Sequence, residues 1–333
     1  MKKQDSRRPG IVDDLSEDNI QDMGRNPELA NIKPLTYTEM MVEKPIPLEN
    51  ILFPWFPVQG IAFIYAATGV GKTMFTLNIA YAIASGGQFL KYSVPKPRKI
   101  LYVDGEMAYS QMHDRFTQIV RQQGELYYPD NWNLLTPDKA HPFKLPKICD
   151  PKGQEFYNKL IDELGIEVLF LDNLSVLSTI DESSSEEWKP IQDWLIFLRG
   201  KGIGVIVVHH AGKDKKGYRG TSRMLDCIDT AISLQDLSES QLETEAVLNK
   251  KFKIDYKKAR TFGGKDALQF EVTLAPTGWS HQSMEITTMD RIIEMLKLNM
   301  SHKEISLELG FTRSYISRLV RKGIKEGLIR NEV

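Results

Sequence analysis

Eight residues, AATGVGKT at positions 66–73, combine glycines, a lysine and a threonine at a spacing that suits the binding of nucleotide phosphates. The apolar run before them predicts a buried strand, and the residues from Met74 onward predict a helix. In such a loop the backbone N–H groups turn towards phosphate oxygens, and the helix start adds a positive end. Lys72 would reach the β- and γ-phosphates of ATP, and the Thr73 hydroxyl would bind Mg²⁺.

We assign the nucleotide phosphates to one continuous segment: Thr68, Gly69, Val70, Gly71, Lys72, Thr73 and Met74. Ala66 stands where the pattern usually has its first glycine. A glycine-rich turn without a ligand is the alternative. The order strand, loop and helix favours the phosphate-binding P-loop.

Two acidic residues follow other apolar runs and could complete a site for ATP hydrolysis. Asp172 closes the run VLFL, where a carboxylate would hold Mg²⁺ together with Thr73, and a simple strand cap is the alternative. Glu106 follows the run KILYVDG, and a carboxylate beside the γ-phosphate could orient and deprotonate the attacking water. Glu106 is our candidate catalytic base. Asp104 is its competitor, and a solvated turn is the third interpretation.

A third strand-like run ends in His209 and His210, whose side chains would point to opposite faces. Either could donate a hydrogen bond to the γ-phosphate and report its loss to the loop beyond, and packing is the alternative. That loop places basic residues and Tyr218 among glycines, a combination suited to a sugar-phosphate backbone. Its candidate DNA contacts are Lys213, Lys215, Lys216, Arg219 and Arg223. An ordinary solvated loop is the other interpretation.

These residues need a parallel sheet that holds them at one edge. From Ile51 to about Gln282, short β-branched runs alternate with amphipathic helical stretches, which predicts an α/β fold with a mostly parallel central sheet flanked by helices. The expected strands are 61–66, 99–105, 132–136, 168–173 and 204–210, with later β segments at 230–235, 252–258 and 267–274. Helices are expected at 109–123 and 187–199, and DESSSEE at 181–187 is interpreted as a short acidic loop.

The C-terminal segment predicts a small all-α domain. Helices at 301–309 and 313–322 with Gly310 in the turn between them have the spacing of a helix-turn-helix. Ile305, Leu309, Ile316 and Leu319 would form its core. The second helix would expose groups that suit phosphates and base edges, namely Arg313, Ser314, Tyr315, Ser317, Arg318, Arg321 and Lys322. Docking of another protein is the alternative role.

We therefore expect three parts: a flexible arm and linker at 1–46, a P-loop ATPase domain at 47–284, and a helix-turn-helix domain, with or without a wing, at 285–333. The formal net charge is −1, so any nucleic acid must meet locally concentrated basic residues. Cys149 and Cys227 form no metal or disulfide pattern. Neither a membrane span of about 20 apolar residues nor a signal peptide is evident, and we expect a cytoplasmic protein without a membrane partner.

The order of these motifs resembles that of the RecA-like ATPases of the plasmid RepA-type and DnaB-type hexameric helicases, the RepA type most closely. The P-loop, Glu106, Asp172, the paired histidines, the basic loop and Lys258-Ala259-Arg260 carry the resemblance, which covers about 51–282. It implies a RecA-like fold and a homo-oligomer, a hexameric ring with ATP bound between subunits. It also implies that Lys258 and Arg260 reach the neighbour's nucleotide, and that replication-initiation proteins are partners. The family does not require the C-terminal tail.

Two functions remain. The preferred one is a ring-forming, DNA-stimulated ATPase that acts as a replicative helicase of a plasmid, phage or integrated element on single-stranded or duplex DNA. The alternative is an ATP-switched DNA-binding regulator or loader that does not unwind DNA. A motor needs Glu106 and Arg260 for turnover, whereas a switch needs Lys72, Thr73 and Asp172 for binding.

Overall fold

The computed structural model describes residues 33–43, 49–122, 129–212, 218–237, 250–283, 288–325 and 328–329 of the 333-residue chain. The chain divides into two compact units, 1–48 and 49–333. The domain boundaries expected at 46/47 and 284/285 stay predictions.

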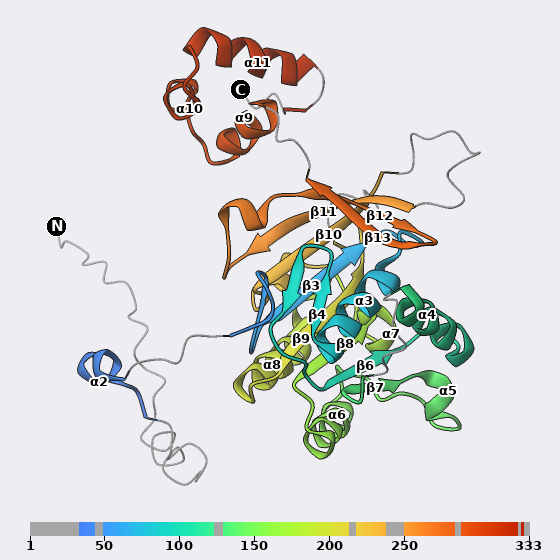
Figure 1. Cartoon of the computed structure of the whole chain (residues 1–333). Coiled ribbons are helices and arrows are strands. Elements are labelled where there is room, and N and C mark those ends of the chain that lie inside the picture. The colour runs from blue at the N-terminus through green and yellow to red at the C-terminus, as the bar shows by residue number, and fades with distance from the viewer. Residues whose placement is uncertain are drawn as a thin grey trace, which may run out of the picture. The chain divides into compact units, whose positions relative to one another are not determined.

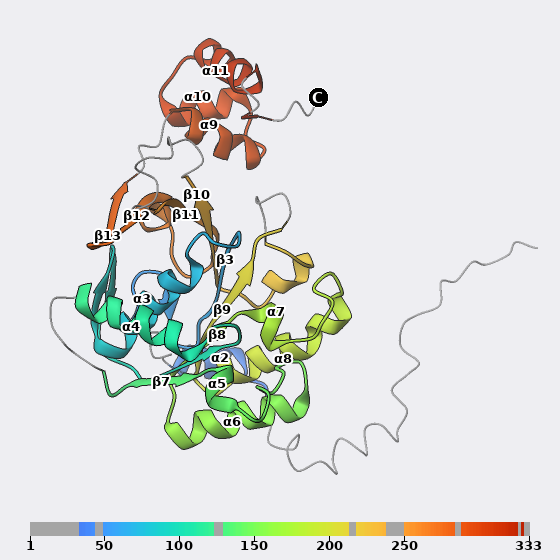
Figure 2. The ribbon, with the colours of Figure 1, turned by 90° about the vertical axis from the view of Figure 1, so that its right-hand side faces the viewer.

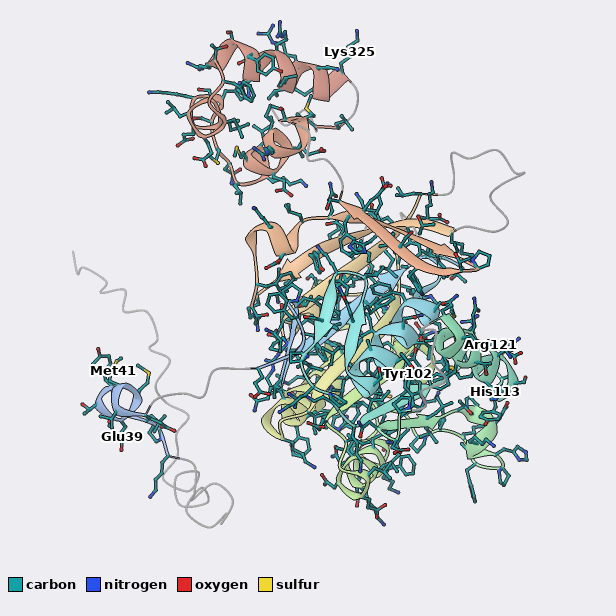
Figure 3. All side chains as sticks on the ribbon, in the orientation of Figure 1. Glu39, Met41, Tyr102, His113, Arg121 and Lys325 are labelled. Atoms are coloured by element: carbon teal, nitrogen blue, oxygen red, sulfur yellow. The ribbon has the colours of Figure 1, made fainter. Side chains whose placement is uncertain are left out.

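The described part of the first unit contains a short helix, α2 (Tyr37–Val42), in a segment for which the sequence predicted no helix. Its start is fixed by a capping box: the Thr36 hydroxyl accepts a hydrogen bond from the N–H of Glu39, whose carboxylate accepts one from the N–H of Thr36. Every residue of α2 is exposed, including Glu39 and Met41, which are labelled in Figure 3. Among the described residues of this unit, the cap is therefore the interaction that holds the turn of helix.

The second unit is built on a nine-stranded sheet, labelled strand by strand in Figure 1. Six neighbouring strands, in the order β10-β3-β9-β8-β6-β7, are parallel, and β11, β12 and β13 continue the sheet beyond β10 as antiparallel strands. The strands are β3 (Ile61–Ala66), β6 (Ile100–Asp104), β7 (Trp132–Leu135), β8 (Val168–Asp172), β9 (Gly204–His210), β10 (Thr230–Asp236), β11 (Lys250–Ala259), β12 (Phe270–Ala275) and β13 (Gly278–Ser283).

Helices cover both faces of the parallel strands, and Figure 2 shows α3 and α4 on one side with α7 and α8 on the other. The central strands are buried on both faces, which is why runs such as IAFIYA are apolar without alternation. One core cluster joins the first face to α3 and α4, and a second joins the opposite face to α6 and α8. The helices are α3 (Lys72–Ser85), α4 (Tyr109–Gln122), α5 (Pro137–Ala140), α6 (Pro151–Leu164), α7 (Leu174–Leu177) and α8 (Ser185–Gly200).

Several short elements were not predicted from the sequence. They include strand β13, the short helices α5 and α7, and the 3-10 turns η2 (Ser222–Leu225) and η4 (Gly264–Ala267). Two strand pairs belong with them: β1 (Asn50–Leu52) with β2 (Phe56–Pro57), and β4 (Gly87–Phe89) with β5 (Tyr92–Val94). The acidic run 181–187 is also only partly a loop, because α8 begins within it. The Ser184 hydroxyl caps α8 by accepting from the N–H of Glu187, and acidic residues suit the positive end of a helix.

The described residues of the C-terminal segment contain three helices: α9 (Thr288–Lys297), α10 (His302–Leu309) and α11 (Arg313–Lys325). Their buried core consists of Ile292, Ile305, Ile316 and Val320, and Leu309 and Leu319 pack against it partly buried. Gly310 ends α10 with a φ of 69°, as expected for the turn. The expected helices at 301–309 and 313–322 are thus present, while the role of a DNA-binding helix-turn-helix stays a prediction.

The α/β class with a mostly parallel sheet and flanking helices is confirmed. β3 and β9 have the predicted bounds, and the other predicted strands differ at their ends by up to three residues. Among the helices of the described residues, none combines the length and apolar character needed to cross a membrane.

Candidate nucleotide site

The P-loop follows β3 directly and leads into α3, in the order that the sequence predicted. Gly69 and Gly71 have φ angles of 83° and 113°, a region that residues with a Cβ rarely adopt, so these two glycines give the loop its path. Thr68 is exposed on the loop. The side chains of Val70 and Met74 belong to the core, so their contribution to a phosphate site would come from backbone N–H groups.

Lys72 is 7% exposed and lies at the start of α3. Its ammonium donates hydrogen bonds to the carbonyl oxygens of Ala66 and Ala67, both at 3.1 Å. Burial lowers the pKa of Lys72, and the carboxylates of Asp172 and Glu106 oppose this shift. The structure therefore brings the predicted phosphate-binding lysine together with both predicted acidic residues.

Asp172 is buried at the carboxyl end of β8. The phenol of Tyr102 donates a hydrogen bond of 2.7 Å to its Oδ2 atom, and the Thr73 hydroxyl also bonds to the carboxylate. Burial raises the pKa of Asp172, and the two hydrogen bonds oppose the shift. The two predicted Mg²⁺ ligands, Thr73 and Asp172, are thus in direct contact.

Asp104 and Glu106 have different surroundings. The Asp104 Oδ2 atom accepts hydrogen bonds from the N–H groups of Met107 (2.7 Å) and Glu106 (3.3 Å), and burial raises the pKa of Asp104 to about 7. The Glu106 side chain is 49% exposed, and its Oε1 atom lies 4.0 Å from Nε2 of His210. Asp104 therefore shapes the turn that presents Glu106, an arrangement that favours Glu106 as the residue facing a nucleotide.

The two histidines point to opposite faces of β9, as predicted. Burial lowers the pKa of His210, Lys72 lowers it further, and Glu106 raises it. His210 therefore lies with the catalytic candidates Lys72 and Glu106. His209 is fully buried against Phe63, with 5.5 Å between ring centroids, and its Nε2–H donates to the carbonyl oxygen of Arg219 at 2.7 Å. Burial lowers the pKa of His209 to about 4.

Glu182, from the acidic run, joins the loop after β8 to the loop after β9. Its carboxylate forms an ion pair with Nε of Arg219 at 2.9 Å, accepts a hydrogen bond from the Ser175 hydroxyl at 2.6 Å, and lies 3.7 Å from Nε2 of His209. Its carbonyl oxygen accepts from the N–H of Thr221 at 2.8 Å. Arg219, a predicted DNA contact, is therefore engaged by Glu182 in this structure.

The other residues of the basic loop are less informative. Lys213, Lys215 and Lys216 lie outside the described residues. Arg223 is exposed on η2. Tyr218 packs on the rings of Phe63 and Tyr65, with 5.7 Å between centroids in each pair, rather than standing free for nucleic acid as its position in the sequence suggested.

Lys258 and Arg260 lie at the opposite edge of the sheet from their own P-loop. β11 is antiparallel to β10, and its end pairs with the start of β10, which is level with the start of β3. The guanidinium of Arg260 contacts Asp229 Oδ1 at 3.0 Å and the Asp226 carbonyl oxygen at 3.1 Å. The Lys258 ammonium donates to the carbonyl oxygen of Leu225 at 2.5 Å. These two residues are thus not brought together with Lys72.

Three residues at or near these sites were not predicted from the sequence. The Lys250 ammonium donates to the carbonyl oxygen of Gly69 in the P-loop at 2.9 Å, from the start of β11. Asp229, besides Arg260, holds Arg199 at 2.6 Å. Tyr102 shares a strand with Asp104 at a spacing of two residues, and this polar pair in a buried run was a signal that the sequence offered.

The predicted DNA contacts of α11 mostly face solvent. Arg313, Ser314, Arg318, Arg321 and Lys322 are exposed, and Tyr315 and Ser317 are half-buried. The Arg318 guanidinium lies over the Tyr315 ring, 5.1 Å from its centroid. The Ser317 hydroxyl lies 3.0 Å from Nδ1 of His302 and joins α11 to α10.

The profile of the AAA domain family matches residues 26–216, which is more than half of the chain and includes the P-loop, Glu106, Asp172 and both histidines. The chain belongs to the AAA-domain family. The structure is similar to that of a KaiC-like protein from the hyperthermophilic archaeon Pyrococcus horikoshii OT3, with 12% sequence identity and a TM-score of 0.49. The match covers 72% of this AAA-domain protein and 100% of the KaiC-like chain. No curated protein matches this sequence.

Membership of the AAA-domain family implies a nucleotide, usually with Mg²⁺. The residues fit this pair of ligands: the Thr73 hydroxyl and the Asp172 carboxylate are in contact beside the P-loop. Among the residues that the structure describes, no three His, Cys, Asp or Glu side chains gather as a metal cage. Proteins commonly hold Mg²⁺ through one or two side chains together with phosphates and water.

Proposed function

We propose that this AAA-domain protein is an ATP-hydrolysing, DNA-stimulated ring motor that acts as a replicative DNA helicase. One observation carries the proposal: Lys72, Glu106, Asp172 and His210 gather beside the P-loop. Lys72 bonds to the carbonyl oxygens of Ala66 and Ala67, Glu106 Oε1 lies 4.0 Å from Nε2 of His210, and Asp172 closes the neighbouring strand β8. Phosphate binding, metal binding, activation of water and sensing of the γ-phosphate would each have a residue at this edge of the sheet.

The chain's own groups would divide the work as follows. The P-loop amides and Lys72 bind and orient the phosphates, and Thr73 and Asp172 hold the metal, which when bound neutralises charge on the phosphate oxygens. Glu106 accepts a proton from the attacking water at its carboxylate. His210 donates a hydrogen bond to the γ-phosphate, and its neighbour His209 passes any shift of β9 to Arg219 and the loop beyond.

In a ring, each nucleotide site would receive a further positive charge from Arg260 of the neighbouring copy. Arg260 is separated from its own P-loop by the length of β3, about 13 Å for four residues of strand. Its side chain is 47% exposed and hence accessible to a second copy of the chain. Repeated contact between these unlike faces closes into a ring when the rotation allows, and Lys258 and Arg260 then meet the neighbour's nucleotide.

DNA would be bound in two places. The loop from Lys213 to Arg223 would contact single-stranded DNA, and the exposed basic side chains of α11 would contact duplex DNA or a specific site. Replication-initiation proteins are the partners that this role implies, and the cytoplasm is its location.

A second function remains consistent with the engaged position of Arg219. In an ATP-switched regulator or loader, nucleotide binding would change the Glu182–Arg219 contact without unwinding. Such a protein would bind ATP through Lys72 and yet tolerate replacement of Glu106.

The experiment is an ATPase assay of the wild-type chain and Lys72→Ala, with and without single-stranded DNA, followed by strand displacement on a forked duplex. We expect hydrolysis that DNA stimulates, displacement that requires ATP, and neither with Lys72→Ala. Hydrolysis without displacement would favour the regulator, and equal hydrolysis by Lys72→Ala would refute the assignment of the P-loop.

A further inference from the structure

Tyr102 is a fully buried tyrosine at the centre of strand β6 and is labelled in Figure 3. It lies on β6, between β8 and β7. Its ring stacks on Phe170 with 5.4 Å between centroids and 17° between planes, and on Trp132 with 5.9 Å and 14°. Both neighbouring strands thus fix the plane of the phenol, and few rotamers remain open to it.

The hydroxyl of Tyr102 connects β8 to the P-loop helix. It donates its proton to Asp172 Oδ2 at 2.7 Å and lies 2.8 Å from the Thr76 hydroxyl. The single Thr76 proton is shared between the phenol oxygen and the carbonyl oxygens of Lys72 and Thr73, each 3.1 Å away. Thr76 is buried in α3, one turn after Thr73. The phenol therefore links the Asp172 carboxylate to the helix that carries Thr73.

The geometry points to Tyr102 as a positioning residue, which holds the Asp172 carboxylate in the orientation that binds Mg²⁺ beside Thr73. With Oδ2 occupied by the phenol, rotation of the carboxylate would break a charge-assisted hydrogen bond between two buried groups. Such outer partners of metal ligands commonly change metal affinity when removed. This inference rests on the proposed nucleotide site.

The test is Tyr102→Phe, which deletes one oxygen and keeps the stacked ring. Tyr157→Phe is the matched control, because Tyr157 is equally buried in the other core cluster and donates to the carbonyl oxygen of Pro146 at 2.9 Å. Binding of a fluorescent ATP analogue is titrated with Mg²⁺ for the wild-type chain and both variants. The same binding is measured in EDTA.

We expect Tyr102→Phe to raise the half-saturating Mg²⁺ concentration on the order of tenfold or more, with unchanged affinity in EDTA. Tyr157→Phe should bind like the wild type, although it too loses a buried hydroxyl. Thr76→Val, which removes the second contact and keeps the phenol, should raise the Mg²⁺ requirement by a smaller factor. It also keeps the test decisive if Tyr102→Phe does not fold.

A folded Tyr102→Phe with the wild-type Mg²⁺ titration would overturn the inference and leave the nucleotide site standing. Should Tyr102→Phe not fold, an unchanged titration of Thr76→Val would overturn it equally. A wild-type chain that binds the analogue with no dependence on Mg²⁺ would remove both the inference and the proposed function.

Discussion

Glu106 and Asp104 are two neighbouring carboxylates with different surroundings. Asp104 accepts two backbone hydrogen bonds within its own turn, whereas Glu106 is half-exposed beside His210. We predict that Glu106→Gln binds ATP and loses turnover on the order of 10²–10⁴-fold, because the water loses its base. Asp104→Asn, which can still accept one of those N–H groups, should lose less.

The measurement is single-turnover hydrolysis at saturating ATP, with nucleotide affinity determined separately. A larger loss in Asp104→Asn than in Glu106→Gln would transfer the role of the base to Asp104.

His209 makes the stability of the protein depend on pH. Its folded-state pKa is about 4, below the ordinary 6.5, because burial disfavours the charged ring, and Glu182, Arg219 and His210 are the charged or titratable groups around it. The unfolded chain therefore takes up this proton first as the pH falls below about 6.5, and the stabilisation by neutral His209 is lost progressively down to pH 4. At pH 5 the free energy of unfolding should be about 1–2 kcal/mol lower than at pH 7.5 because of this residue.

The check is urea unfolding at pH 7.5 and pH 5. His209→Gln, whose amide can still donate to the Arg219 carbonyl, should lose less stability between these pH values than the wild type. His113→Gln is the control, since His113 is 63% exposed at its side chain and points away from the core in Figure 3. The account of His209 fails if both variants lose as much stability as the wild type.

At the scale of residues, the sequence predicted what is local and missed what is distant. The P-loop and the acidic strand ends can be recognised in the sequence, because the residues that would act together are adjacent or a few positions apart along the chain. The hydrogen bonds that surround these residues cannot be recognised in the sequence. Tyr102 and Asp172 are 70 positions apart, and Lys250 and Gly69 are 181 apart. The different surroundings of Asp104 and Glu106 likewise depend on hydrogen bonds of the turn, which the sequence does not show.

Two loops leave neighbouring strands β8 and β9, and Glu182 ties them together. We predict that Glu182→Gln loosens the start of the loop after Arg219, because the ion pair and one of its charge-assisted hydrogen bonds are weakened. Hydrogen exchange of a peptide over 218–225 should become faster. Its N–H groups report on the loop, because that of Arg219 donates to the carbonyl oxygen of His210 and that of Thr221 to the carbonyl oxygen of Glu182.

Glu186→Gln is the matched control, with the same change of charge at an exposed residue in the first turn of α8. Equal exchange in both variants would show that Glu182 does not hold this loop.

At the scale of elements, burial governs what a sequence reveals. Strands such as β3 and β9 are buried at nearly every residue, and their continuous apolar runs were predicted with the bounds that the structure has. The pairs β1–β2 and β4–β5 have two or three residues per strand, too few for a periodic signal. Helix α2 depends on a cap, which pattern analysis of apolar residues overlooks.

At the scale of the whole molecule, the placement of Arg260 is the observation from which the proposed ring is argued. Arg260 lies with Asp229 at the edge of the sheet opposite the P-loop. Strand β11 therefore places no arginine beside the P-loop of its own chain. The resemblance in the sequence implies that Arg260 acts on a neighbour's nucleotide, and the proposal of a shared site rests on the register of β10 and β11, which places Arg260 away from its own P-loop.

The most direct test of the account is to mix two inactive variants, Lys72→Ala and Arg260→Ala. Arg260→Ala should bind ATP nearly as the wild type does and turn over far more slowly, since the guanidinium would act mainly in the transition state. A site that takes its P-loop from an Arg260→Ala subunit and its arginine from a Lys72→Ala subunit is complete. We therefore predict that ATP hydrolysis returns on mixing and depends on the ratio of the two. If both variants are folded and exchange subunits, and every mixture stays inactive, the shared site is contradicted.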